Sequence, residues 1–316
     1  FFQGQALQVA MFDAAPKGLV DVLAEGQFDL AHVQLVRLAP LRERLAPLPC
    51  VYDLVDALSL NMARRAAVDR GPMAFIARRE VAPLARLEHE LCQNVAAVAV
   101  CSPADRLAIG DDRLQLVGNG VDLRRFPFVA DRLTSNDLIF VGNLGYFPNV
   151  DAATWFAQQV LPLLRAQIPD LRLRLVGARP APSLVRLAEQ TPNVELVGPV
   201  ADVHPYLAQA AVAVVPMRAG SGQQLKILEA MASGTPVVAS AVSAAGLSAV
   251  DGEHLLVAND AQTFADAIVK LLRNADLRSK LSNAARVLVE QFYSWDASAR
   301  DLERLWLQAA HKNSAQ

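Results

Sequence analysis

The chain has 316 residues, of which 53% are hydrophobic, and its formal net charge at pH 7 is −2. So small a net charge gives no electrostatic argument for a nucleic acid as partner. No apolar run reaches the roughly 18 residues that a transmembrane helix needs. The three cysteines, Cys50, Cys92 and Cys101, lack metal-ligand spacing and are predicted to be buried, reduced thiols of a cytoplasmic protein. The length predicts two domains rather than one.

Short apolar runs alternate with amphipathic stretches in the first part of the chain. Strands are predicted at residues 28–35, 50–56, 95–102 and 113–119, and a helix at about 74–94. This alternation indicates a parallel sheet with helices on its faces. The chain opens on a helix-like segment instead of a strand and a glycine-rich turn. Either the first domain is naturally small, or its opening strands lie outside the sequence given, and we expect the second.

A polar stretch at residues 126–137 is predicted to be a linker, after which the alternation restarts. Strands are expected at residues 138–144, 171–178, 194–200, 211–217 and 254–258, and another directly after Pro236. This pattern is typical of a complete doubly wound domain. The predicted domains are residues 1–128 and 137–292, with a last helix in 293–316 that packs back on the first domain.

A glycine-rich turn and the helix after it carry the clearest chemical signal. Gly220 and Gly222 free the backbone, and a helix start presents unpaired N–H groups that accept an anion such as a phosphate. Lys226 and Glu229 lie on one face of this otherwise apolar helix. A buried carboxylate is costly without a partner, so Glu229 either forms an ion pair with Lys226 or holds a polar ligand.

Two common phosphate-binding motifs are absent from this turn. A P-loop would need a lysine followed by serine or threonine, and no aspartate is placed to hold magnesium. The dinucleotide-binding pattern Gly-x-Gly-x-x-Gly is also missing, because the turn reads Gly-Ser-Gly-Gln-Gln-Leu.

The stretch GSGQQLKILEAMASGTPVVAS resembles the nucleotide-sugar signature of the GT-B glycosyltransferases, family 4 (glycosyl transferases group 1). In that family a glycine-containing loop precedes a helix that reads Lys-x-x-Glu-Ala-Met-Ala and a Gly-x-Pro-Val-Val strand. Further segments resemble the family in order, namely NGVDLRRF, LIFVGNLGYFPNVDAATWF, LRLRLVGARP and VELVGPVADVHPYLAQA. The resemblance implies an α/β chain of the GT-B fold, with two Rossmann-like, doubly wound domains facing a cleft and the N-terminal one incomplete.

The resemblance also implies a function and a set of residues. It implies a retaining transfer of a sugar from a nucleotide-diphosphate sugar to a glycan, lipid-linked or small-molecule acceptor, with no metal or other cofactor. The resemblance leaves peripheral contact with the inner face of the membrane open. Residues 64–86 carry several arginines, but glutamates balance some of them, which favours a solvated helix face. Asp56, Lys226 and Glu229 are the implied catalytic residues. The implied donor-binding residues are Gly142, Asn143, Gly198, Arg218, Gly220, Ser221, Gly222, Gln223, Lys226 and Glu229.

The sequence departs from the family pattern at two places. Ser221 stands where many members have a first glutamate, which usually meets the sugar. Asn143 and Asn149 stand about where many members have an arginine and a lysine. The charge of the diphosphate would then fall to the lysine of the helix, helped by Arg218 or Arg179. A non-catalytic nucleotide-sugar-binding subunit and a nucleotide-sugar epimerase remain as alternatives.

Candidates for the acceptor side lie in or directly after the first two strands. Asp53 and Asp56 lie towards the end of the second predicted strand, where the family often has a histidine or an aspartate. The alternative for them is structural: Asp56 caps a helix and Asp53 lies in a solvated turn. His32 and Arg37 belong to the first strand and its end, and the alternative for His32 is a hydrogen-bonded strand residue.

Overall fold

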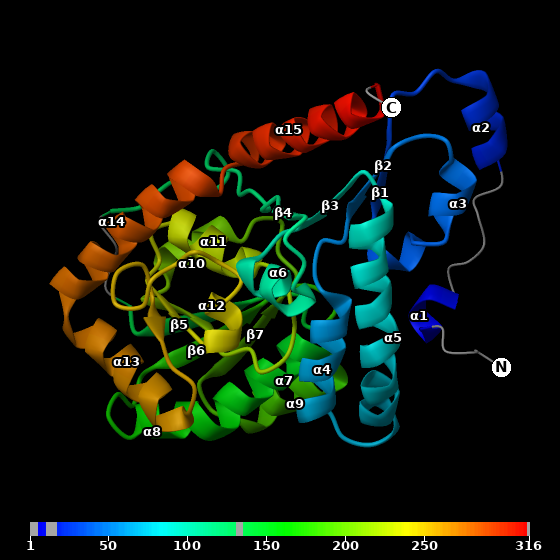
Figure 1. Ribbon diagram of the computed structural model, residues 1–316. Coiled ribbons are helices and arrows are strands. Elements are labelled where there is room, and N and C mark those ends of the chain that lie inside the picture. The colour runs from blue at the N-terminus through cyan, green and yellow to red at the C-terminus, as the bar shows by residue number, and fades with distance from the viewer. Residues whose placement is uncertain (1–5, 11–17, 131–134, 315–316) are drawn as a thin grey trace. The chain divides into compact units, whose positions relative to one another are not determined.

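The computed structural model describes residues 6–10, 18–130 and 135–314. The chain forms two compact units, each with its own parallel sheet (Figure 1). The first unit comprises Phe1–Gly118, Ala219–Gln223 and Ser298–Gln316, and the second Asn119–Arg218 and Gln224–Ala297. The predicted α/β class with two parallel sheets is confirmed. Residues 11–17 of the expected helical opening and residues 131–134 of the expected linker lie outside the described residues.

The sheet of the first unit has four parallel strands in the order β1-β2-β3-β4. The strands are β1 Ala31–Gln34, β2 Cys50–Asp53, β3 Ala97–Val100 and β4 Leu114–Leu116. They are shorter than the predicted runs because local turns end them. At the end of β2 the Asp53 carboxylate accepts the Val55 N–H at 2.8 Å, and Val55 has a φ of 65°. Such a turn cannot continue a strand.

Helices and a short 3₁₀ turn surround this sheet. They are α1 Leu7–Ala10, α2 Leu19–Glu25, η1 Val36–Leu38, α3 Leu41–Leu45, α4 Leu58–Val68, α5 Pro72–Asn94, α6 Pro103–Ile109 and the larger part of α15 Trp295–Ser314. The helix predicted at 74–94 corresponds to α5, and α4 has no counterpart among the predicted elements. Figure 1 shows α4 and α5 running side by side. In α15, Leu305 and Ala309 pack against Val51 and Ala99 of the sheet.

The second unit has a six-stranded parallel sheet in the order β10-β9-β8-β5-β6-β7. Its strands are β5 Asp137–Val141, β6 Arg172–Val176, β7 Val194–Gly198, β8 Val212–Val215, β9 Val237–Ala239 and β10 Leu256–Val257. All four residues of β8 are buried, as expected for a strand covered on both faces. The chain winds outward from β5 in one direction and from β8 in the other, so the topology reverses between these two neighbours.

The helices of this unit follow its strands. They are α7 Phe147–Trp155, the π-helical η2 Phe156–Val160, α8 Leu161–Arg165, α9 Pro182–Gln190, α10 His204–Gln209, α11 Leu225–Ala232, α12 Ala241–Ala244, α13 Ala261–Arg273 and α14 Ala275–Phe292. The predicted doubly wound pattern of this part is confirmed by the strand order.

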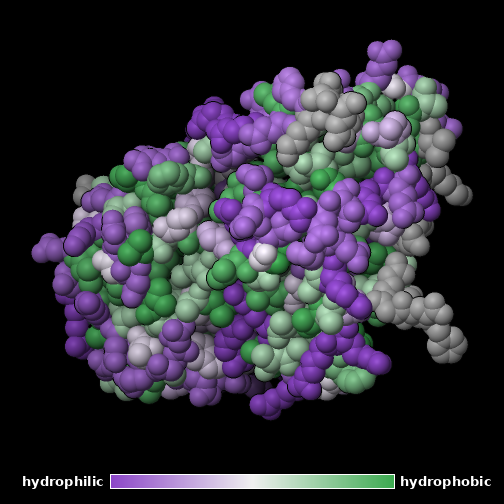
Figure 2. Space-filling view, viewed as in Figure 1, coloured by the Kyte–Doolittle hydropathy of each residue, from purple (hydrophilic) through white to green (hydrophobic). Residues whose placement is uncertain are grey.

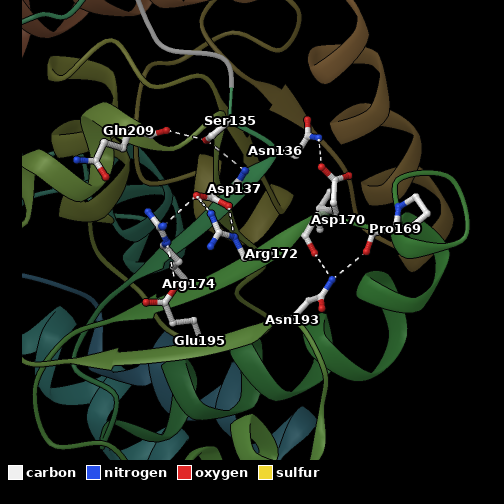
Figure 3. Close-up of polar contacts among 11 residues, drawn as sticks. Ser135, Asn136, Asp137, Pro169, Asp170, Arg172, Arg174, Asn193, Glu195 and Gln209 are labelled. Carbon is white, nitrogen blue, oxygen red and sulfur yellow. Dashed lines mark hydrogen bonds and ion pairs between the residues drawn. The ribbon is translucent and has the colours of Figure 1, made fainter.

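A charged network ties together the amino ends of β5, β6 and β7 (Figure 3). Asp137 is buried and accepts two hydrogen bonds from Arg172, at 2.8 and 3.0 Å. Arg174 lies 3.1 Å from Asp137 and also 3.1 Å from Glu195 on β7. Because the network joins three neighbouring strands at one level, it supports their register.

Candidate functional site

The carboxyl ends of β5 and β8 mark the place where the sheet of the second unit reverses its winding. In open α/β sheets such a reversal leaves a crevice between the two loops that leave it, and ligands bind there. The β5 loop carries Gly142 and Asn143 and leads into α7. The β8 segment passes Met217 and Arg218, and α11 follows with Lys226 and Glu229. The structure thus brings these predicted residues to one edge of one sheet.

Lys226 is one of the cations at this edge. Its Nζ donates a hydrogen bond to Asn149 Oδ1 at 2.5 Å and lies 4.7 Å from the centre of the Phe140 ring. Burial lowers the pKa of Lys226 to about 7, and the nearby Glu229 carboxylate opposes that shift. The amine is therefore close to half protonated at neutral pH, and an anionic ligand would favour its charged form.

Asn149 connects Lys226 to the β5 loop. Its Nδ2 donates to the Asn143 carbonyl oxygen at 2.9 Å, while its Oδ1 accepts from Lys226. A Cβ added at Gly142 would lie 2.9 Å from Asn149 Nδ2, so the close approach depends on glycine. Asn149 is absent from the predicted donor-binding residues. Its signal in the sequence was that it occupies the place of a family cation.

Glu229 lies on α11 one turn beyond Lys226. Among the residues that the structure describes, its carboxylate makes no salt bridge within 4.0 Å and accepts no hydrogen bond, whereas its backbone oxygen accepts one from the Ser233 hydroxyl at 2.8 Å. Burial raises the pKa of this carboxyl, and the charges of Arg125 and Lys226 partly offset the increase. A partly buried carboxylate without a hydrogen-bond donor is costly in the absence of a ligand. An ion pair with Lys226 would have given the Glu229 carboxylate a structural partner, but this pair is not formed.

Other predicted residues of the second unit have different environments. Arg218 forms a bidentate ion pair with Asp151, in which one hydrogen bond is 2.9 Å long. The charge of the Arg218 guanidinium is therefore already balanced within the protein. Arg179 is exposed, with a left-handed φ of 56°. Gly198 ends β7 with a φ of 78°, a conformation that favours glycine.

The glycine-rich segment 219–223 belongs to the first unit, and four of its residues in succession bond to side chains there. The pairs are Gly220 O with Arg64 Nη1 at 2.8 Å, the Ser221 hydroxyl with Asp56, Gly222 N with Asp105 at 3.0 Å, and Gln223 N with Cys101 Sγ at 3.3 Å. Two N–H groups expected to face an anion therefore point at acceptors of the protein itself.

The acceptor-side candidates also acquire partners within the first unit. Asp56 does not cap α4, whose N-cap residue is Ala57 and receives no side-chain cap. The Ser59 N–H of that helix donates to Glu88 instead, at 3.0 Å. His32 Nδ1 accepts the Trp306 indole N–H at 3.0 Å, and Arg37 donates to Gln8. His32 thus has the hydrogen-bonded environment of its structural alternative.

The described ranges contain neither a cluster of metal ligands nor a membrane-spanning helix. Within residues 6–10, 18–130 and 135–314, no three or more His, Cys, Asp or Glu side chains gather closely enough to hold a metal ion. Over the same ranges, none of the helices has both the length and the apolar character required to cross a bilayer.

Comparison with known sequences gives consistent matches. Residues 135–274 match the family model of the glycosyl transferases group 1. A D-inositol 3-phosphate glycosyltransferase of Corynebacterium aurimucosum is 30% identical over 231 residues, which are 63% of this chain and 52% of that protein. A phosphatidyl-myo-inositol mannosyltransferase of Mycobacterium tuberculosis is 27% identical over 325 residues, covering 96% of this chain and 80% of the relative. The chain spans about half the length of the first of these relatives.

Solved structures give the fold. Sucrose-phosphate synthase of Thermosynechococcus elongatus matches with a TM-score of 0.73 at 21% identity, over 93% of this chain and 80% of that one. HepE of Anabaena in complex with UDP-glucose matches with a TM-score of 0.66 at 17% identity, over 96% and 84% of the two chains. At these identities the likeness concerns the fold alone, which is the predicted GT-B fold.

Proposed function

Because residues 135–274 match the family model of the glycosyl transferases group 1, we propose that the chain belongs to this family and transfers a sugar from a nucleotide-diphosphate sugar to a glycan, lipid-linked or small-molecule acceptor. The observation that carries this proposal is Glu229, a partly buried carboxylate without a hydrogen-bond donor among the described residues. Ribose hydroxyls of a nucleotide would supply such donors. Lys226, one turn earlier on α11, would meet the diphosphate.

The proposed reaction depends on stabilising the leaving group. As the bond to the anomeric carbon breaks, negative charge grows on the nucleoside diphosphate, and a preorganised cation lowers that barrier. Lys226 is held for this role by Asn149. We propose a retaining, metal-independent transfer in which Lys226 and Glu229 act on the donor and Asp56 acts on the acceptor side. The proposed donor-binding residues are Gly142, Asn143, Gly198, Arg218, Gly220, Ser221, Gly222, Gln223, Lys226 and Glu229, to which we add Asn149.

The proposed domain roles follow from the same reasoning. Residues 137–292 would bind the donor and residues 1–128 the acceptor, with residues 293–316 as a helix on the acceptor domain. The named activities of the relatives favour a polyol phosphate or a lipid that carries one as acceptor. A phosphorylated acceptor also suits the exposed cations Arg78 and Arg79 on α5.

Peripheral membrane contact remains part of the proposal, and we assign it to the start of α5. The exposed fractions of Met73, Phe75 and Ile76 there are 44%, 58% and 37%. The exposed Arg78 and Arg79 follow one turn later. Hydrophilic and hydrophobic residues lie interleaved on the face seen in Figure 2. Apolar side chains beside arginines fit the surface of an anionic bilayer.

A thermal-shift panel of UDP, GDP, ADP, dTDP and CDP tests the donor site. At a hundred times Kd, a nucleotide that binds only the folded state adds about 2.7 kcal/mol of stability. We expect one nucleotide to raise the Tm of the wild type and of Glu189→Ala, which removes an exposed carboxylate of the same unit. Glu229→Ala should lose that increase. No shift with any nucleotide would contradict the proposed donor site.

Turnover then separates the proposed transferase from its alternatives. The nucleotide that binds would be supplied as its sugar derivatives with glycan, lipid-linked and polyol phosphate acceptors. Release of nucleoside diphosphate together with a glycosylated acceptor supports the transferase. Binding without either product supports the non-catalytic subunit, and isomerisation of the donor sugar without release supports the epimerase.

A further inference from the structure

Asp105 joins three separate segments of the first unit. Its side chain is fully buried, with an exposed fraction of 0%, and accepts three hydrogen bonds. The donors are the Ser102 hydroxyl, the Ala57 N–H at 3.1 Å and the Gly222 N–H at 3.0 Å. One carboxylate therefore connects the start of α6, the turn before α4 and the glycine-rich segment 219–223.

The bonds of Asp105 set the geometry of a neighbouring pair. Asp56 precedes Ala57, Ser221 precedes Gly222, and the Ser221 hydroxyl donates to the Asp56 carboxylate. Because Asp105 fixes the backbone on both sides, it aligns the two members of this pair. The backbone at Gly222 approaches Asp56 closely, because a Cβ added at Gly222 would lie 3.3 Å from Asp56 Cβ. The φ of Gly222 is 70°, which also favours glycine.

The same contacts make the segment a poor cradle for a phosphate. The Gly222 N–H is directed at Asp105, and the adjacent Gln223 N–H is directed at Cys101 Sγ. An anion placed at these groups would have to compete with the Asp105 carboxylate for the Gly222 N–H. The diphosphate is left to the second unit, where Lys226 lacks an ion-pair partner within 4.0 Å among the described residues.

We propose that Asp105 is a positioning residue that orients the Asp56–Ser221 pair for sugar transfer, and that segment 219–223 takes no part in holding the diphosphate. This inference rests on the proposed function, and it restricts the role of the segment to the sugar and the acceptor. Ser221 occupies the place of the family's first glutamate. Its bond to Asp56 supplies a carboxylate at that place from another element of the chain.

The test compares Asp105→Ala and Asp105→Asn with Asp112→Asn, which changes an exposed acid of the same unit. Three quantities are measured: amide hydrogen exchange in residues 219–223, the Kd of the nucleoside diphosphate, and kcat with KM for the sugar donor. Asp105→Ala should raise exchange and lower kcat by about 100-fold, as expected for a small misplacement of reacting groups. The Kd should stay within about twofold, and Asp112→Asn should match the wild type.

Asp105→Asn keeps an oxygen that can accept a hydrogen bond from one of the two N–H groups, those of Ala57 and Gly222. The amide exchange at residues 219–223 and the kcat of this variant should therefore fall between those of the alanine variant and the wild type. It also serves if the alanine variant does not fold, as judged by its Tm. Unchanged exchange at 219–223, unchanged kcat, or a tenfold weaker Kd in either variant would overturn the inference. Failure of the proposed function looks different, because the wild type would then bind no nucleotide and transfer no sugar.

Discussion

The amine of Lys226 should make donor binding depend on pH near neutrality. Burial lowers its pKa to about 7, so it is mostly protonated at pH 6 and mostly neutral at pH 8.5. Only the protonated amine attracts a diphosphate. The Kd of the sugar nucleotide should therefore rise by about tenfold or more over this window, since a hydrogen bond to a charged group contributes about 1.5–3 kcal/mol. Isothermal titration at several pH values measures it.

Lys226→Arg provides the matched control for this titration. A guanidinium remains protonated throughout the window, so the Kd of this variant should be nearly independent of pH, whatever its absolute value. The sugar nucleotide is preferred to the free diphosphate as ligand, because a terminal phosphate itself titrates at a pKa of about 6. A pH-independent Kd in the wild type would contradict the role of Lys226.

Some residues of the candidate site could be predicted from the sequence and others could not. Lys226 and Glu229 lie one helical turn apart, so their shared face follows from helix geometry alone. Asn149 approaches Lys226 from 77 residues away, and Asp105 reaches Gly222 across 117 residues. No periodicity reports contacts over such separations. They depend on which strands are neighbours and on how each chain segment enters its loop.

Among the elements, the amino ends of β5, β6 and β7 should depend on Asp137. Asp137→Ala leaves Arg174, whose side chain is only 16% exposed, with Glu195 as its remaining partner. We expect the free energy of unfolding to fall by about 1–3 kcal/mol, the usual cost of removing one partner from buried hydrogen bonds. Urea denaturation measures it. Asp170→Ala, at an exposed hydrogen bond to Asn136, should change far less. Equal losses would contradict this role of the network.

The start of α5 should bind anionic bilayers. Co-sedimentation with vesicles of phosphatidylglycerol and phosphatidylcholine should recover the wild type with the anionic lipid only. Replacing Phe75 and Ile76 together by alanine should remove most of the binding, because both side chains are exposed and neither supports the core. Leu107→Ala, with 84% of Leu107 exposed on α6, is the matched control. Equal binding by the double variant and the control would contradict the assignment.

The elements themselves differ in how well the sequence predicts them. Most strands of both sheets lie within apolar runs, and burial on both faces keeps those runs nearly unbroken. Helix α4 escapes prediction because its buried face includes Ser59 and Asn61. Their burial is compensated by Glu88 and Asp56, and the Ser59 partner lies 29 residues along the chain. A polar residue with a distant partner is indistinguishable in sequence from one that faces water.

For the whole molecule, the division of the chain is not continuous in sequence. Segment 219–223 and residues 298–316, which include most of α15, belong to the first unit, although each directly follows a stretch of the second unit along the chain. The apolar pattern predicts two sheets that follow one another along the chain. It does not report which unit a five-residue loop joins, because that depends on neighbours distant in the sequence, such as the side chains that form the four hydrogen bonds with this segment.

Separate cores in the two units predict that heat unfolds the protein in two transitions. One hydrophobic cluster, around Phe140 and Phe264, is confined to the second unit, and another, around Tyr52 and Leu84, to the first. Proteins with more than one core commonly depart from two-state unfolding.

A nucleoside diphosphate that contacts Lys226 and Glu229 should raise the Tm of only one of the two transitions in scanning calorimetry. The added stability is about 2.7 kcal/mol at a hundred times Kd. Glu229→Ala should abolish that increase while leaving both transitions in place. An equal increase of both transitions would mean that the diphosphate also contacts the first unit, and it would return segment 219–223 to the phosphate site.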